Sequence, residues 1–252
     1  MSTRTIKLNF TLLLALLLFG KCSKLPDEDL LDGLSQQLAE TNDFIILSPE
    51  EGTPKTTIIF YPGGLVDPHS YLKWQDQMVA GDSTLQIITV KMPSNLAVIN
   101  SNKGSKLFDH YTDMERWIIS GHSLGGAMAT NMIDKYPEKL KALIYLAAYP
   151  ADDRINDYTG SVLSISAEND GLTTPADIQD RMNDLPEAYE MNSILDFPND
   201  VKAKTLYYQI EGGNHAQFGN YGEQDDDLEA TITREQQQNQ MVELIRNYLN
   251  QL

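Results

Sequence analysis

The sequence predicts a single α/β domain with a mostly parallel central sheet and helices on both faces. Apolar runs of strand length alternate along the chain with segments of helical character, as in βαβ units. Several of these runs end directly in Gly- or Pro-containing turns. A length of 252 residues suits one domain of this class and leaves too little chain for a second one.

The expected strands are short apolar runs, several of them rich in β-branched residues. In chain order they cover residues 44–47, 56–61, 85–90, 116–120, 140–148, 161–166 and 204–210. Helices are expected over about 70–78 and 127–133, after Thr174, and at the C-terminus after Thr233. Thr174 stands before a proline and an acidic residue, which is a helix-start pattern, and Thr233 has capping-box spacing to Gln236.

The first 21 residues have the pattern of an export signal. Two basic residues precede the apolar run 10–19, which is too short to span a membrane comfortably, so we expect a secretory signal or an uncleaved N-terminal anchor. Residues 22–43 are expected to form a tether and 44–252 the folded domain. Cys22 follows the apolar run after Gly20 and Lys21 and is a candidate lipidation site in the cell envelope. Lys21, which stands where a small residue is usual, leaves open the alternative of a chance cysteine after an ordinary signal.

Charge and cysteine content exclude several classes of partner. The chain has 36 acidic and 19 basic residues and a net charge of −17, so it repels nucleic acid and anionic lipid, and contact with a membrane is expected only through the N-terminus. A single cysteine allows no intrachain disulfide and no cysteine-based metal site. The run Asp225–Asp227 lacks the spacing of a cation site, and we expect a solvated acidic loop and no metal.

The most informative stretch is Gly121–Gly126, a Gly-x-Ser-x-Gly pattern between an expected strand and an expected helix. Glycines at this turn let the strand and the helix approach each other, and the central serine takes a strained backbone conformation. Ser123 would then project its hydroxyl beyond the sheet edge, at the positive end of the helix. The alternative is a glycine-rich turn that merely contains a serine.

Parallel sheets place their sites at the carboxyl ends of the strands. The loops after four expected strands contain Gly64, Ser123, Asp170 and His215. A serine, an acid and a histidine in this order form a catalytic triad, in which imidazole takes the serine proton and the acid fixes the imidazole tautomer. The backbone N–H groups of Gly64 and Leu124 are the expected oxyanion donors, with Leu65 as the fallback in place of Gly64.

Other residues compete for two of these roles. Glu168, Asp152 and Asp153 are the alternatives to Asp170 as the acid. The remaining histidines are His69 and His110, which precede the serine turn, and His122, which is expected to point away from the nucleophile.

The chain resembles the α/β-hydrolase superfamily, and within it the small cap-less group related to dienelactone hydrolases, called the alpha/beta hydrolase family 5 type. The matching segments are 60–68, 91–93, 121–126, 146–150 and 211–219. The resemblance implies Ser123 as nucleophile, Asp170 as acid, His215 as base and no cofactor. Dienelactone hydrolases proper use a cysteine nucleophile, so their substrate is not carried over.

We therefore expect an exported serine hydrolase that cleaves a small-molecule carboxylic ester through an acyl-enzyme. The same triad would support thioester hydrolysis or acyl transfer. A catalytically silent surface protein that binds a ligand is the alternative from another class. No long insertion before Asp170 offers a lid, so an open site is expected, bordered by the loop 219–231, whose charge would disfavour anionic substrates.

Overall fold

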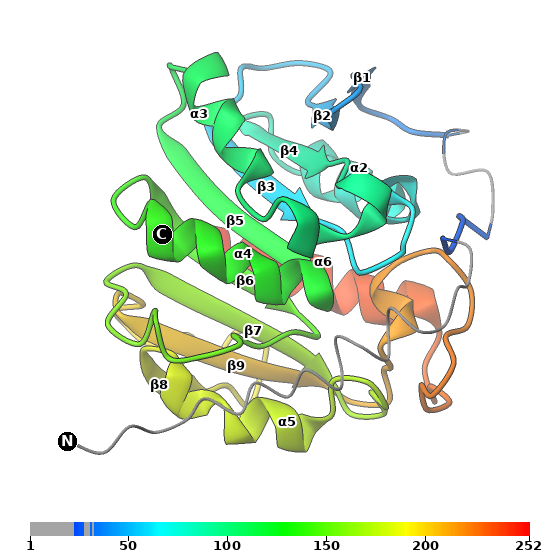
Figure 1. Ribbon diagram of the computed structural model, residues 1–252, viewed down its shortest axis with the longest axis vertical. Helices are drawn as coiled ribbons and strands as arrows, with labels where there is room; N and C mark the ends of the chain where they lie inside the picture. Colours follow the sequence, from blue (N-terminus) through cyan, green and yellow to red (C-terminus); the bar gives the residue numbers. More distant parts are fainter. Residues whose placement is uncertain (1–22, 28–30, 32) are drawn as a thin grey trace.

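The computed structural model describes residues 23–27, 31 and 33–252 (Figure 1). The expected signal or anchor, residues 1–21, and the candidate lipidation site Cys22 lie outside the described residues. Over the described ranges, no helix has the length and apolar character needed to cross a membrane.

One mostly parallel sheet forms the centre of the molecule, which confirms the predicted fold class. In the described part of the chain it has nine strands in the order β1-β2-β4-β3-β5-β6-β7-β9-β8. The β1–β2 and β2–β4 pairs are antiparallel and the other neighbours are parallel. The strands are β1 (Gln37–Glu40), β2 (Phe44–Ser48), β3 (Thr56–Tyr61), β4 (Leu85–Val90), β5 (Arg116–His122), β6 (Leu140–Leu146), β7 (Ser161–Ala167), β8 (Glu187–Glu190) and β9 (Lys204–Ile210).

Helices cover both faces of this sheet (Figure 1). They are α2 (Leu72–Ala80), α3 (Leu107–His110), α4 (Leu124–Lys135), α5 (Pro175–Asp180) and α6 (Arg234–Leu249). Alternate residues of β3 enter two separate cores, because successive side chains of a strand point to opposite faces. Ile58 and Phe60 pack with α2 and α6, whereas Ile59 and Tyr61 pack with α3 and α4.

The two helix starts that the sequence marks are formed as expected. Thr174 and Asp177 form a capping box at α5, and Thr233 and Gln236 form one at α6. Each box satisfies N–H groups that have no partner within the helix. The apolar stripe of α6 is buried, so this helix is fixed both at its start and along one face.

The sheet begins earlier in the chain than the sequence predicts. β1 lies inside the segment 22–43 that we expected to be a tether, and it pairs with β2 at the sheet edge. All four of its residues are exposed, so it has no apolar alternation from which a strand could be predicted. β8 at the other edge is also mostly exposed, although Tyr189 is partly buried against the core. Edge strands are held by backbone pairing on one side, and their side chains face water.

Residues 23–27, here called the N-terminal segment, also lie against the domain. The N–H of Lys24 donates to the carbonyl oxygen of Leu65 (2.6 Å), and the N–H of Asp67 donates to the carbonyl oxygen of Lys24 (2.8 Å). The carboxylate of Asp27 pairs with Arg234 at the start of α6 (2.7 Å). The N-terminal segment therefore borders the loop that follows β3.

Candidate active site

The turn between β5 and α4 has the strained geometry expected of a nucleophile elbow. Ser123 has φ 54° and ψ −127°, a conformation that residues with a side chain rarely adopt. A Cβ atom added at Gly121 would lie 2.6 Å from the backbone of Gly125, and one at Gly125 would collide with the carbonyl oxygens of Tyr61 and Pro62. The close approach of β5, β3 and α4 therefore requires glycine at both positions.

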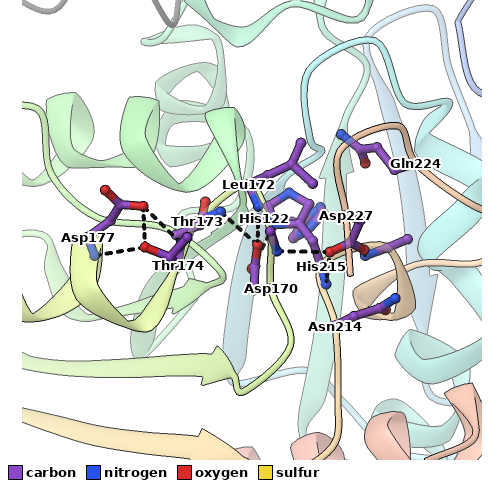
Figure 2. Close-up of polar contacts among 12 residues, drawn as sticks. His122, Asp170, Leu172, Thr173, Thr174, Asp177, Asn214, His215, Gln224 and Asp227 are labelled. Atoms are coloured by element: carbon purple, nitrogen blue, oxygen red, sulfur yellow. Dashed lines mark hydrogen bonds and ion pairs between the residues drawn. The ribbon is translucent and has the colours of Figure 1, made fainter. Parts of the chain in front are cut away.

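Asp170 and His215 are brought together from the loops after β7 and β9 (Figure 2). Nδ1 of His215 donates to Oδ2 of Asp170 (2.8 Å), and both side chains are buried. The N–H groups of Leu172 (2.9 Å) and Thr173 (2.6 Å) donate to Oδ1 of Asp170, so this carboxylate is fixed on both oxygens. Nε2 of His215 is buried and forms no hydrogen bond with the described residues, which leaves it able to accept a proton.

The competing acids and histidines either have other partners or are exposed. Glu168 accepts the N–H of Gly212 (2.8 Å), and Asp152 pairs with Arg154. Asp153 and His110 are exposed. His69 is also paired with carboxylates, but Asp67 binds its Nδ1 (2.7 Å) and Glu40 its Nε2 (3.2 Å). With both nitrogens occupied and its pKa raised by these partners, His69 has no nitrogen available as a base.

The loop after β3 leaves one particular N–H group available. The N–H of Gly63 donates to the Tyr71 hydroxyl (2.9 Å), and that of Leu65 donates to the carbonyl oxygen of Asn95 (2.8 Å). Among the described residues, no hydrogen bond uses the N–H of Gly64. A Cβ atom at Gly64 would lie 2.8 Å from the Leu124 side chain, so the two predicted oxyanion donors are neighbours. Leu124 is the first residue of α4, where an N–H has no partner within the helix.

The residue before Ser123 in the chain packs against the buried pair. The rings of His122 and His215 lie 4.6 Å apart between centroids. The sequence predicts that His122 points away from the nucleophile. In the structure its ring instead lies against His215, because β5 ends at His122 next to the loop that carries His215. No hydrogen bond joins the Ser123 hydroxyl to His215 in the described chain, a common condition in unliganded hydrolytic sites.

Comparison with known proteins agrees with this fold. A sequence profile described as "Alpha/beta hydrolase family" matches residues 57–239. The chain belongs to the alpha/beta hydrolase family. Among solved structures, it is similar to a predicted CIB-like hydrolase from Thermoplasma acidophilum, with a TM-score of 0.57, 12% sequence identity, and coverage of 85% of this chain and 98% of that one. At this identity the likeness supports the fold alone. No curated protein sequence matches at a significant level.

Two residues of this α/β-hydrolase site were not singled out by the sequence. Tyr71 is buried; its hydroxyl accepts the N–H of Gly63 and donates to Nδ1 of His122 (3.0 Å). Burial, followed by the charge that His215 carries when protonated, lowers the pKa of His122 well below its usual value, so His122 is neutral. Tyr71 therefore connects the loop after β3 to the elbow, and nothing in its local sequence indicates this role.

Asp227 is the second such residue. The expectation of a solvated acidic loop at Asp225–Asp227 is wrong for this residue, because backbone N–H groups surround its carboxylate. One of these donors, the N–H of Gly171, is 56 residues away in the sequence, so only the fold reveals this contact. In the described residues, no cluster of three or more His, Cys, Asp or Glu side chains is arranged to hold a metal ion.

Proposed function

We propose that this α/β hydrolase is an exported serine hydrolase that cleaves carboxylic esters through Ser123, His215 and Asp170. The observation that supports the proposal most is the buried Asp170–His215 pair beside the elbow, with Nε2 of His215 unengaged. A neutral imidazole with one nitrogen held by a carboxylate and the other available is the arrangement that general-base catalysis requires.

In the first half of the proposed reaction, Oγ of Ser123 attacks the ester carbonyl carbon while its proton passes to Nε2 of His215. The carbonyl oxygen becomes an oxyanion, for which the N–H groups of Gly64 and Leu124 are the proposed donors. The imidazolium then gives its proton to the leaving oxygen as the ester C–O bond breaks. An alcohol departs, and the acyl group stays on Ser123. Asp170 stabilises the imidazolium and keeps Nε2 directed at the reaction.

In the second half, water attacks the acyl-enzyme and gives its proton to His215. The second tetrahedral intermediate then collapses: the bond between the acyl carbon and Oγ of Ser123 breaks, the imidazolium returns its proton to Oγ, and a carboxylic acid leaves. An alcohol could replace water in this step, in which case the product is a new ester. Added short alcohols therefore distinguish acyl transfer from hydrolysis by the ratio of ester to acid formed.

The test uses a short-chain p-nitrophenyl ester and a fluorophosphonate probe. Ser123→Ala should lower turnover by roughly 10⁶-fold and abolish labelling, because the nucleophile is lost. Ser193→Ala, at an exposed serine after β8, is the matched control and should retain both. Unchanged turnover in a folded Ser123→Ala variant would contradict the proposal. No turnover on a broad ester panel and no labelling of the wild type would favour a silent binding protein.

Export is proposed from the N-terminal sequence, with acylation of Cys22 as the anchor. Metabolic labelling with an alkynyl fatty acid should mark the wild type and leave Cys22→Ser unmarked. Equal labelling of both proteins, or of neither, would remove the anchor from the proposal.

A further inference from the structure

Asp227 lies between β9 and α6, in the loop that precedes the last helix. Its carboxylate accepts four backbone N–H groups. Oδ1 accepts those of Gly171 (3.1 Å), His215 (3.2 Å) and Leu228 (3.1 Å), and Oδ2 accepts that of Ala216 (2.9 Å). Hydrogen bonds from N–H groups to an ionised carboxylate are about twice as strong as those between neutral groups. The side chain of Asp227 thus holds several backbone segments together.

Three of the four donors, Gly171, His215 and Ala216, belong to the buried pair or lie next to it in the sequence. Gly171 directly follows Asp170, and His215 provides both an N–H to Asp227 and the ring that binds Asp170. A Cβ atom at Gly171 would collide with the carbonyl oxygen of Asp226, so the two loops pack closely at this point. One further backbone bond, from Asn169 to Gly213 (2.8 Å), joins the loops on the far side of the acid.

The charge of Asp227 is also placed near the base. In the described part of the chain, no lysine or arginine forms an ion pair with it, so its negative charge is balanced by N–H dipoles alone. Several other titratable or charged groups lie around His215. Asp170 follows β7, His122 ends β5, and Tyr71 precedes α2. Tyr221 and Asp227 precede α6, and Arg234 on α6 pairs with Asp27. His122 is neutral, and burial raises the pKa of Tyr71 and of Tyr221, so the negative charges next to His215 are the two carboxylates.

We propose that Asp227 is a positioning residue for the acid and base of this site: it ties the Asp170 loop to the His215 loop and keeps the imidazole against Asp170. This role rests on the proposed function, in which His215 is the base. Asp227 touches no reacting atom in that mechanism. Its loss should therefore change the rate of the chemical steps and leave substrate binding nearly unchanged.

The test compares Asp227→Asn with Asp226→Asn. The two variants remove the same charge from adjacent positions, but the side chain of Asp226 is exposed and accepts none of these N–H groups. In Asp227→Asn, an amide NH₂ replaces one carboxylate oxygen and faces an N–H donor. We expect kcat for the p-nitrophenyl ester to fall by about 10²-fold, the cost of a misplacement of about 1 Å, with little change in KM. Asp226→Asn should keep kcat within about 2-fold of the wild type.

The pH profile gives a readout that a merely structural role would not change. The base acts in its neutral form, so activity rises with pH along the acidic limb of the profile. A weaker contact with Asp170 and the loss of a nearby negative charge both disfavour the imidazolium, so the acidic limb of kcat/KM should move to lower pH in Asp227→Asn. An equal displacement in Asp226→Asn would mean that charge alone acts, and would overturn the positioning role.

A measurement without substrate separates this proposal from the proposed function. The Nδ1 proton shared by His215 and Asp170 should give a strongly downfield NMR signal in the wild type, and this signal should broaden or vanish in Asp227→Asn alone. That result would support the positioning role even if the wild type hydrolysed no ester. A signal unchanged in folded Asp227→Asn, together with unchanged kcat, would refute it. If the asparagine variant does not fold, Asp227→Ser is measured in its place, and loss of the fold in both would make Asp227 a purely structural residue.

Discussion

At the scale of single residues, the site depends on which backbone N–H groups are already engaged. In the loop after β3, those of Gly63 and Leu65 have partners, and that of Gly64 has none among the described residues. The N–H of Leu65, our fallback donor for the oxyanion, is directed to the carbonyl oxygen of Asn95. Gly64 is therefore the better candidate of the two.

Gly64→Pro tests this assignment, because proline has no N–H. We expect a loss of about 10²–10³ in kcat, the usual cost of one oxyanion donor. Gly64→Ala is the matched control. It keeps the N–H and adds a methyl group that meets the flexible end of the Leu124 side chain, so its loss of kcat should be much smaller. The measurement is steady-state ester hydrolysis by variants with native circular dichroism. Equal losses in both would indicate crowding of the loop and argue against Gly64 as a donor.

At the scale of elements, the start of α2 supports the elbow through one hydroxyl. Tyr71 lies at the junction of a 3₁₀ turn, Pro68–Tyr71, with α2, and it is fully buried. Its hydroxyl satisfies the N–H of Gly63 and also reaches His122 at the end of β5. Three elements thus meet at one oxygen atom, next to the proposed oxyanion donors.

Tyr71→Phe should weaken both the fold and the site. A buried N–H left without a partner costs about 1–3 kcal/mol in the free energy of unfolding. Turnover should also fall, because the loop that carries Gly64 loses one of its attachments. Tyr145→Phe is the matched control: its buried hydroxyl bonds Thr130 (2.6 Å) between β6 and α4. The measurements are the free energy of unfolding in urea and kcat for ester hydrolysis. An equal loss of turnover in both variants would contradict a specific role for Tyr71.

The elements also show which parts of the fold and of the site could be predicted from the sequence. The parallel strands have continuous apolar runs, and the elbow glycines lie within a few residues of Ser123, so both are local signals. The order of Ser123, Asp170 and His215 could be found because each follows a strand with a clear pattern. Tyr71 and Asp227 could not, because each makes a contact with a residue far away in the sequence: His122 is 51 residues from Tyr71, and Gly171 is 56 residues from Asp227. The polar edge strands β1 and β8 have no apolar pattern and depend on their neighbours for pairing.

At the scale of the whole molecule, β1, the loop after β3 and the end of β4 are held together by charged side chains. His69 lies between Asp67 and Glu40, and Glu40 also pairs with Lys91 (2.7 Å). The hydrogen bond to Asp67 is the main reason that the pKa of His69 is raised above its ordinary value. The pKa of each of the two carboxyl groups is lowered by these contacts.

This cluster predicts a pH dependence of stability. A histidine whose pKa is raised by folding adds stability that is complete below its unfolded pKa, near 6.5, and is lost as pH rises through its folded pKa. The two carboxylates stay ionised down to about pH 4–5. His69→Gln should therefore destabilise the protein more at pH 5.5 than at pH 8.5, measured by urea unfolding. His110→Gln, at an exposed histidine with no ion pair in the described chain, is the control. A difference between wild type and His69→Gln that is the same at both pH values would contradict the prediction.

The N-terminal segment has a consequence for where substrate would come from. The Ser23 hydroxyl accepts a hydrogen bond from the Asn95 side chain (3.0 Å), and the carbonyl oxygen of Asn95 accepts the N–H of Leu65, next to Gly64. With Cys22 acylated as proposed, no flexible linker would separate the lipid from the catalytic edge of the sheet. The catalytic edge would then be held close to the leaflet, and esters dissolved in that leaflet would be near Ser123. A soluble form without the lipid would have to collect the same esters from bulk water.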